Sequence, residues 1–187
     1  MRFMTGFVAP ALLAGVLAAC QPTAETNRVG PDLVTLHGPL AQYDRGGMQA
    51  AEEPLFASYG LAFERALGFT ASELAAFDPL TLDTDFPAGS DTHSFSGPLL
   101  RDVLALAGVS DRSVRVTALD GYQRDISADR YQSHDVILAL FQDGRPLGIG
   151  GRGPAMLVWP RGTDPALTGM NDDDWVYGVF AIEVLTD

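Results

Sequence analysis

The chain has 187 residues, of which 47% are hydrophobic and 19% charged, a composition typical of one globular domain. Its formal net charge is −12, and all 12 basic residues are arginines. This acidity argues against a surface that binds nucleic acid, because phosphate binding needs a basic patch. The lack of lysine excludes Schiff-base and P-loop chemistry, and the single cysteine excludes an intrachain disulfide or a multi-cysteine metal site.

The N-terminal segment has the layout of a secretory signal. Arg2 supplies a positive charge, and residues 7–19 form an apolar stretch that is too short to span the ~30 Å hydrocarbon core of a bilayer as a helix. Small residues then precede Cys20, as they do before a signal cleavage point. We therefore expect residues 1–19 to be a signal peptide that is absent from the mature protein.

The sequence Leu-Ala-Ala-Cys at 17–20 resembles the lipobox of bacterial lipoproteins. The resemblance implies that Cys20 is the mature first residue and carries the acyl chains that anchor the protein in the lipid bilayer. Gln21, where inner-membrane lipoproteins have aspartate, favours the outer membrane. Residues 20–32 then form a polar tether with two prolines. We expect a lipid-anchored, periplasm-facing protein of a bacterial cell envelope.

Short strands and one capped helix are predicted for the first part of the domain at 33–187. Thr70 and Glu73 have the spacing of a capping box, and the helix that they begin stops before Pro79. Apolar runs and alternation predict strands on both sides of this helix. The expected elements are a strand over 33–38, a loop over 44–54, a strand over 63–69, a helix over 71–77 and a strand over 80–84.

The clearest predicted helix covers residues 98–107. Ser96 or Gly97 would cap it, Pro98 would stand in its first turn, and Gly108 would end it.

The apolar positions of that helix, 99, 100, 103, 104 and 107, fall on one face. We expect Leu100 and Leu104 to be buried in the core. Arg101 is expected at the helix surface or in a cleft.

The rest of the chain has β patterning. Asp-Gly pairs at 120–121 and 143–144 predict two hairpins, and two further strands follow. A few helices among many strands indicate an α+β class with a mixed sheet. The expected strands cover 114–118, 122–126, 136–141, 145–149, 156–159 and 179–185.

The segment 148–153 matches G-x-G-x-x-G in letters only. Pro154 and a β-type run follow it, whereas a dinucleotide site requires a helix to begin there. Two interpretations remain, a flexible connection between strands or a loop that binds an anion through backbone N–H groups and Arg152.

Histidines and acidic residues give weaker signals. His37, His93 and His134 lack the spacing of zinc ligands. His93 is placed on the loop before the predicted helix, where it either takes part in a site or hydrogen-bonds locally. The acidic run at 171–174 lacks the ligand spacing of an EF-hand, so it is either a solvated turn or an oxygen-rich calcium site.

Five segments carry a resemblance to a known family. The string THSFSGPLLRDVL at 92–104, with Ala-Gly-Val at 107–109, resembles the S/T-G helix segment of the oxidoreductase molybdopterin-binding domain, which has the sulfite-oxidase-like fold. Further pieces resemble that family in the same order. They lie at 117–122, 136–147, 152–160 and 175–184. The resemblance implies an α+β domain with a mixed, partly barrel-like sheet and a few short helices.

In catalytic members of that family, a cysteine ligates molybdenum shortly before the S/T-G helix. The corresponding position here falls near Thr84, and no cysteine is present there. A neutral hydroxyl does not replace the soft thiolate ligand. The signal also has Arg2 without a second arginine, which favours export of an unfolded chain that carries no cytoplasmic cofactor.

Three interpretations remain. The first is a ligand-binding or accessory module without molybdenum catalysis and without a cofactor, in which the cleft that holds the cofactor in catalytic members holds a small anionic or organic ligand. The second is an active molybdopterin-dependent oxidoreductase of the sulfite oxidase type, and the third is a structural envelope protein. The resemblance gives no catalytic residue and no metal ligand. The candidate cleft residues are Thr84, His93, Arg101, Arg152 and Arg161.

Overall fold

The structure of the chain is a computed structural model that describes residues 30–186. The expected signal segment, Cys20 and the tether up to residue 29 lie outside the described residues. Within 30–186, none of the helices has the length and apolar character needed to cross a membrane.

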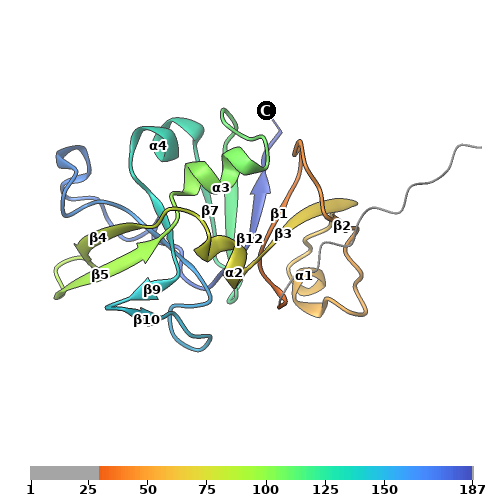
Figure 1. Cartoon of the computed structure of the whole chain (residues 1–187), viewed down its shortest axis with the longest axis horizontal. Helices are drawn as coiled ribbons and strands as arrows, with labels where there is room; N and C mark the ends of the chain where they lie inside the picture. Colours follow the sequence, from red (N-terminus) through yellow and green to blue (C-terminus); the bar gives the residue numbers. More distant parts are fainter. Residues whose placement is uncertain (1–29, 187) are drawn as a thin grey trace, which may run out of the picture.

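Short helices are embedded among many strands (Figure 1). The helices are α1 (Pro54–Ser58), α2 (Ala71–Ala75), α3 (Leu100–Leu106), α4 (Ala128–Ser133) and the 3-10 helix η1 (Pro165–Leu167). The strands are β1 (Asp32–His37), β2 (Arg45–Gly46), β3 (Arg65–Thr70), β4 (Leu80–Asp85), β5 (Thr92–Gly97), β6 (Val114–Ala118), β7 (Gln123–Ile126), β8 (Ile137–Ala139), β9 (Phe141–Gln142), β10 (Arg145–Pro146), β11 (Met156–Val158) and β12 (Val179–Val184).

The largest sheet is mixed, which confirms the predicted α+β class. Its order is β2-β3-β1-β12-β6-β7, with β1 and β12 parallel and the other neighbours antiparallel. A second sheet has the order β10-β9-β5-β4, and β11 pairs with β8. Both larger sheets end in edge strands, so neither closes into a barrel. In Figure 1, β4 and β5 lie at the opposite end of the molecule from α1 and β2.

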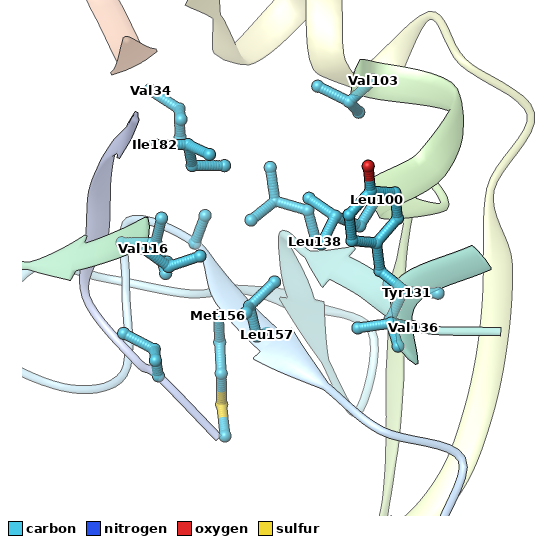
Figure 2. Packing of buried hydrophobic residues seen from close by; sticks show 14 of the residues in the cluster. Val34, Leu100, Val103, Val116, Tyr131, Val136, Leu138, Met156, Leu157 and Ile182 are labelled. Atoms are coloured by element: carbon cyan, nitrogen blue, oxygen red, sulfur yellow. The ribbon is translucent and has the colours of Figure 1, made fainter. Parts of the chain in front are cut away.

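The hydrophobic core lies between the six-stranded sheet and the layer formed by α3, β8 and β11. Val34 and Ile182 point from the sheet toward Leu100 of α3 and Leu138 of β8 (Figure 2). These four side chains are completely buried. Close packing of this kind leaves little room for a change of volume at any of them.

The predicted capping box of α2 is confirmed. Thr70 Oγ1 accepts a hydrogen bond from the Glu73 amide at 3.2 Å, and Glu73 Oε2 accepts one from the Thr70 amide at 2.8 Å. The helix buries Leu74 completely and ends at Ala75, two residues earlier than expected.

The predicted helix over 98–107 is present but shorter, and its predicted cap is wrong. Helix α3 begins at Leu100, while Ser96 and Gly97 belong to β5. The reason is tertiary, because β5 pairs with β4 along its whole length. A Cβ atom at Gly97 would collide with the carbonyl oxygen of Leu138, so the glycine permits the close approach of β8.

Other differences concern short elements. Residues 45–46 and 54–58, expected in a loop, form β2 and α1. Helix α4 has no predicted counterpart, because only Tyr131 is buried among its mainly polar residues. The second hairpin is shorter than predicted, with β10 ending at Pro146.

His37 is a buried titratable residue of the six-stranded sheet. Its side chain on β1 is buried and stacks on Phe63 with ring centroids 5.2 Å apart. No group within the described residues forms a hydrogen bond with its Nε2. Burial holds the pKa of His37 below its usual value, although Glu183 opposes this effect.

A pH titration of stability tests this effect. The unfolded chain takes up a proton below about pH 6.5 whereas folded His37 resists it, so the free energy of unfolding should fall as the pH falls below that value. The His37→Gln variant should lose this component of the pH dependence. Urea unfolding at pH 7.5, 6.5 and 5.5 measures it, and an equal dependence in both proteins would contradict the prediction.

Candidate functional site

Strand β4 places Thr84 in the protein interior. Leu82 and Thr84 are buried while Thr81 and Asp83 are exposed, as the two-residue period of a strand requires. Thr84 is only 2% exposed, and its Oγ1 has no hydrogen-bond partner among the described residues. A buried hydroxyl without a hydrogen-bond partner is costly to the folded state.

The loop after β11 packs closely against Thr84. A Cβ atom at Gly162 would lie 2.8 Å from the carbonyl oxygen of Asp83 and 3.5 Å from the Cα of Thr84. Glycine at this position therefore allows the loop to contact the β4 backbone. The same contact brings the preceding residue, Arg161, beside the end of β4.

Arg161 is the most extensively bonded side chain of this region. Its Nε donates to Asp85 Oδ1 at 3.0 Å, and its Nη2 donates to the Asp85 carbonyl at 2.7 Å. Its Nη1 donates to Asp172 Oδ1 at 2.7 Å and to the Met170 carbonyl at 2.9 Å. The guanidinium also lies 4.6 Å from the ring centroid of Trp175. The side chain is only 7% exposed, and its hydrogen-bond donors are used mainly by groups of the protein itself.

Asp85 is correspondingly stabilised as a carboxylate. The amide of Gly89 donates to Asp85 Oδ2 at 2.5 Å, and Arg161 adds its hydrogen bond and its charge. These interactions hold the pKa of Asp85 below its usual value, with the Gly89 amide as the main cause. The pair is thus an internal ion pair at neutral pH.

Arg152 is also engaged by the protein. Its Nη1 donates to Gln142 Oε1 at 3.0 Å, and its Nη2 donates to the Phe86 carbonyl at 2.9 Å. The guanidinium lies 4.9 Å from the ring centroid of Phe86 and 6.0 Å from that of Phe95. Arg152 therefore joins the glycine-rich loop to the residue that follows β4 and to β9.

In the glycine-rich loop at 148–153, two backbone amides form hydrogen bonds within the loop itself. The amides of Gly151 and Gly153 both donate to the carbonyl oxygen of Gly148, at 3.1 and 3.0 Å. These groups close the turn on itself, so they are not directed at an anion. The geometry favours the interpretation as a connection between strands.

His93 lies on β5, not on a loop as predicted, and is the register partner of Thr84. Its Nδ1 is 2.8 Å from Asp143 Oδ2, and the amide of Ser94 donates to Asp143 Oδ1 at 3.0 Å. The Ser94 amide, and after it His93, hold the pKa of Asp143 below its usual value. This geometry supports the local hydrogen-bonding interpretation of His93.

Arg101 belongs to a different part of the molecule. From α3 it donates to the His134 carbonyl at 3.3 Å and pairs with Asp135 at 2.7 Å. These contacts join α3 to the segment after α4. The structure therefore gathers four of the five predicted cleft residues around β4, β5 and β9, and leaves Arg101 outside that group.

The acidic run at 171–174 contains residues whose roles were missed. Asp172 pairs with Arg161, and Asp174, which is 6% exposed, pairs with both Arg124 and Arg130. The acidic run by itself gives no sign of such partners, because Arg124 and Arg130 lie 50 and 44 residues away from Asp174 in the sequence. Neither a solvated turn nor a calcium loop describes these two carboxylates.

Comparisons with known proteins agree with the fold. The sequence model of the oxidoreductase molybdopterin binding domain matches residues 64–176. The crystal structure of the sulfane dehydrogenase SoxCD from Paracoccus pantotrophus is similar, with a TM-score of 0.56 and 18% sequence identity. That match covers 83% of this chain but only 38% of the SoxCD chain, and at this identity it shows the fold alone. None of the curated proteins matches the sequence.

The residues around β4 do not fit a molybdenum cofactor. No cysteine occurs within 30–186, and Thr84 offers a hydroxyl that is neutral at neutral pH. No group of three or more His, Cys, Asp or Glu side chains in the described part of the chain is arranged to hold a metal ion. Arg152 and Arg161, the expected partners of a pyrophosphate, already bind groups of the protein itself.

Proposed function

Because the chain belongs to the oxidoreductase molybdopterin binding domain family, we propose that it is a ligand-binding or accessory module that keeps this fold without molybdenum catalysis. One observation carries the proposal. Thr84 has a buried hydroxyl without a partner among the described residues, near the position where the family resemblance implies a thiolate. A hydroxyl lacks the softness and acidity by which cysteine sulfur binds such a metal.

The arginines support the same proposal. A bound pyrophosphate would have to displace Asp85 or Asp172 from Arg161, although both carboxylates are held there at 2.7–3.0 Å. The displaced carboxylates would then repel the anion at short range. The net charge of −12 adds to this repulsion.

The alternative is an active molybdopterin-dependent oxidoreductase. The family match and the fold of SoxCD favour it. It would require a metal held without a thiolate.

An activity assay distinguishes the two functions. Protein purified from its native envelope is mixed with reduced methyl viologen and a sulfoxide, and oxidation of the dye is followed. We expect the rate to equal that of a heat-denatured sample, since residues 30–186 contain no cysteine to hold the metal. A catalytic rate that rises with the molybdenum content of the sample would refute the proposal.

We propose further that the protein is exported and anchored in the envelope through Cys20. The short apolar segment and the lipobox-like sequence at 17–20 support this proposal. A triacylated cysteine would hold the domain at the membrane through a tether of about a dozen residues.

Replacement of Cys20 by serine tests the anchor. Without sulfur no thioether forms, so Cys20→Ser should shift the protein from the membrane fraction to the soluble fraction, or leave an uncleaved precursor. Fractionation followed by immunoblotting measures both results. The control is Thr23→Ser, a conservative change in the tether that should leave partitioning unchanged. Normal cleavage and membrane partitioning of Cys20→Ser would contradict the proposal.

A further inference from the structure

A small cavity with aromatic and acidic walls lies beside the end of β4. Its volume is about 240 Å³. It is lined by residues from the loop after β4, the β6–β7 turn and the segment before β12: Phe86, Ala118, Asp120, Tyr122, Asp172, Asp173, Trp175 and Tyr177. Pockets for drug-sized ligands measure about 300–1,000 Å³, so this cavity suits a smaller molecule.

The aromatic walls form a connected group. Phe86 and Trp175 stack with ring centroids 5.3 Å apart, and Tyr177 meets Phe86 edge-on at 6.2 Å. Phe86 and Trp175 already have cations against them, from Arg152 and Arg161.

Unlike Phe86 and Trp175, the two tyrosines of the cavity have no arginine from residues 30–186 against their rings. Tyr122 and Tyr177 are 44% and 45% exposed, and no arginine within the described residues lies over either ring. Large exposed aromatic residues on the wall of a cavity are typical of binding sites. The face of an aromatic ring is negative and attracts cations.

Two of the three carboxylates that line the cavity form no direct ion pair in the described part of the chain. Asp172 pairs with Arg161, whereas neither Asp120 nor Asp173 forms a direct ion pair within residues 30–186. Asp173 accepts a hydrogen bond from the side-chain amide of Asn171 at 2.9 Å, and, after the hydrogen bond to Asp174, its charge contributes to raising the pKa of Arg124. Asp120 accepts the amide of Tyr122 at 3.0 Å, and the hydroxyl of Tyr122 donates to the Asp173 carbonyl at 2.9 Å. The second bond holds the Tyr122 ring against the backbone of the acidic segment, and the first holds the Asp120 carboxylate near the Tyr122 backbone.

We propose that this cavity binds a small organic cation whose nitrogen carries alkyl groups, such as a quaternary ammonium. Two exposed tyrosine rings, with the carboxylate of Asp120 that forms no ion pair within residues 30–186, favour a ligand that is both positively charged and apolar. An anion would meet the same carboxylate. A bare metal ion would find no oxygen donors on the ring faces, and the described residues hold no arranged metal-ligand group. This inference rests on the proposed function, because it names the class of ligand that the binding module would hold.

Calorimetric titration of the mature, detergent-solubilised protein tests the proposal. The probe is choline, and the comparison is 3,3-dimethylbutan-1-ol, which has the same shape without the charge. We expect choline to bind about tenfold or more tightly, because only the cation interacts with the ring faces and carboxylates. Equal binding of both molecules, no binding of choline, or binding of calcium in its place would each overturn the proposal.

Matched variants locate the binding. Tyr177→Leu and Asp120→Asn should each weaken choline binding about three- to tenfold. Asp111→Asn makes the same change of charge at an exposed position outside the cavity lining and should leave binding unchanged. Thermal unfolding shows that each variant is folded. Undiminished binding in both cavity variants would overturn the placement.

The failure of this inference differs from failure of the proposed function. If choline does not bind and the protein lacks molybdenum, the cation site is wrong while the non-catalytic module stands. If the native protein contains molybdenum and turns over a sulfoxide, the proposed function is wrong whatever choline does.

Discussion

Replacement of Arg161 by leucine is expected to lower the free energy of unfolding by about 3 kcal/mol. The change removes four hydrogen bonds and leaves Asp85 and Asp172 facing each other without their cation. Their side chains are 27% and 32% exposed, so water offsets part of the loss and the value lies at the lower end for a broken buried pair. Urea unfolding measures the change.

The control for this change is Arg145, whose side chain has no comparable set of hydrogen bonds in the described structure. Arg145 lies exposed on the edge strand β10, and no ion pair of Arg145 occurs in the described structure. Arg145→Leu should change stability by no more than about 0.5 kcal/mol. Similar losses in the two variants would show that the Arg161 network does not stabilise the fold.

Truncation of Leu104 to alanine should lower the free energy of unfolding by about 2–5 kcal/mol, through lost burial and the cavity left behind. Leu104 is completely buried on the inner face of α3, as its position in the apolar stripe predicted. Leu106 of the same helix is 48% exposed, and Leu106→Ala should cost less than about 1 kcal/mol. Thermal and urea unfolding of both variants measure the difference, and equal losses would contradict the assignment of the buried face.

Local patterns predicted most of the secondary structure. Alternation placed β1, β6, β7 and β12 within one or two residues, and the Thr70–Glu73 pair placed the start of α2. The start of α3 was misplaced because Ser96 and Gly97 look like a helix cap when only the local sequence is considered. Their pairing with β4 depends on residues that are distant in the sequence.

The candidate site was predicted less completely, for a physical reason. Thr84 was singled out as a candidate from a linear motif, and in the structure its side chain is buried. The partners of Arg152 and Arg161 include Phe86 and Asp85, which lie 66 and 76 residues away in the sequence. A sequence shows that an arginine is present but not which carboxylate neutralises it, so both were expected to be available for an anion.

The cavity beside β4 was missed for the same reason. Its walls come from three separate segments, and no single segment carries a recognisable motif. The Asp-Gly-Tyr sequence at 120–122 was interpreted as a hairpin signal and as part of the family resemblance, although it also supplies Asp120 and Tyr122 to the cavity.

The metal content of the native protein tests the central claim most directly. Protein purified from its own envelope, with Cys20 intact, is analysed for molybdenum by mass spectrometry and for pterin by fluorescence after oxidation. Because no cysteine within residues 30–186 lies near Thr84, where the family resemblance implies a thiolate, and the neighbouring arginines are bound to the protein itself, we predict only trace molybdenum and no pterin. Molybdenum and pterin in a one-to-one ratio with the chain would contradict it.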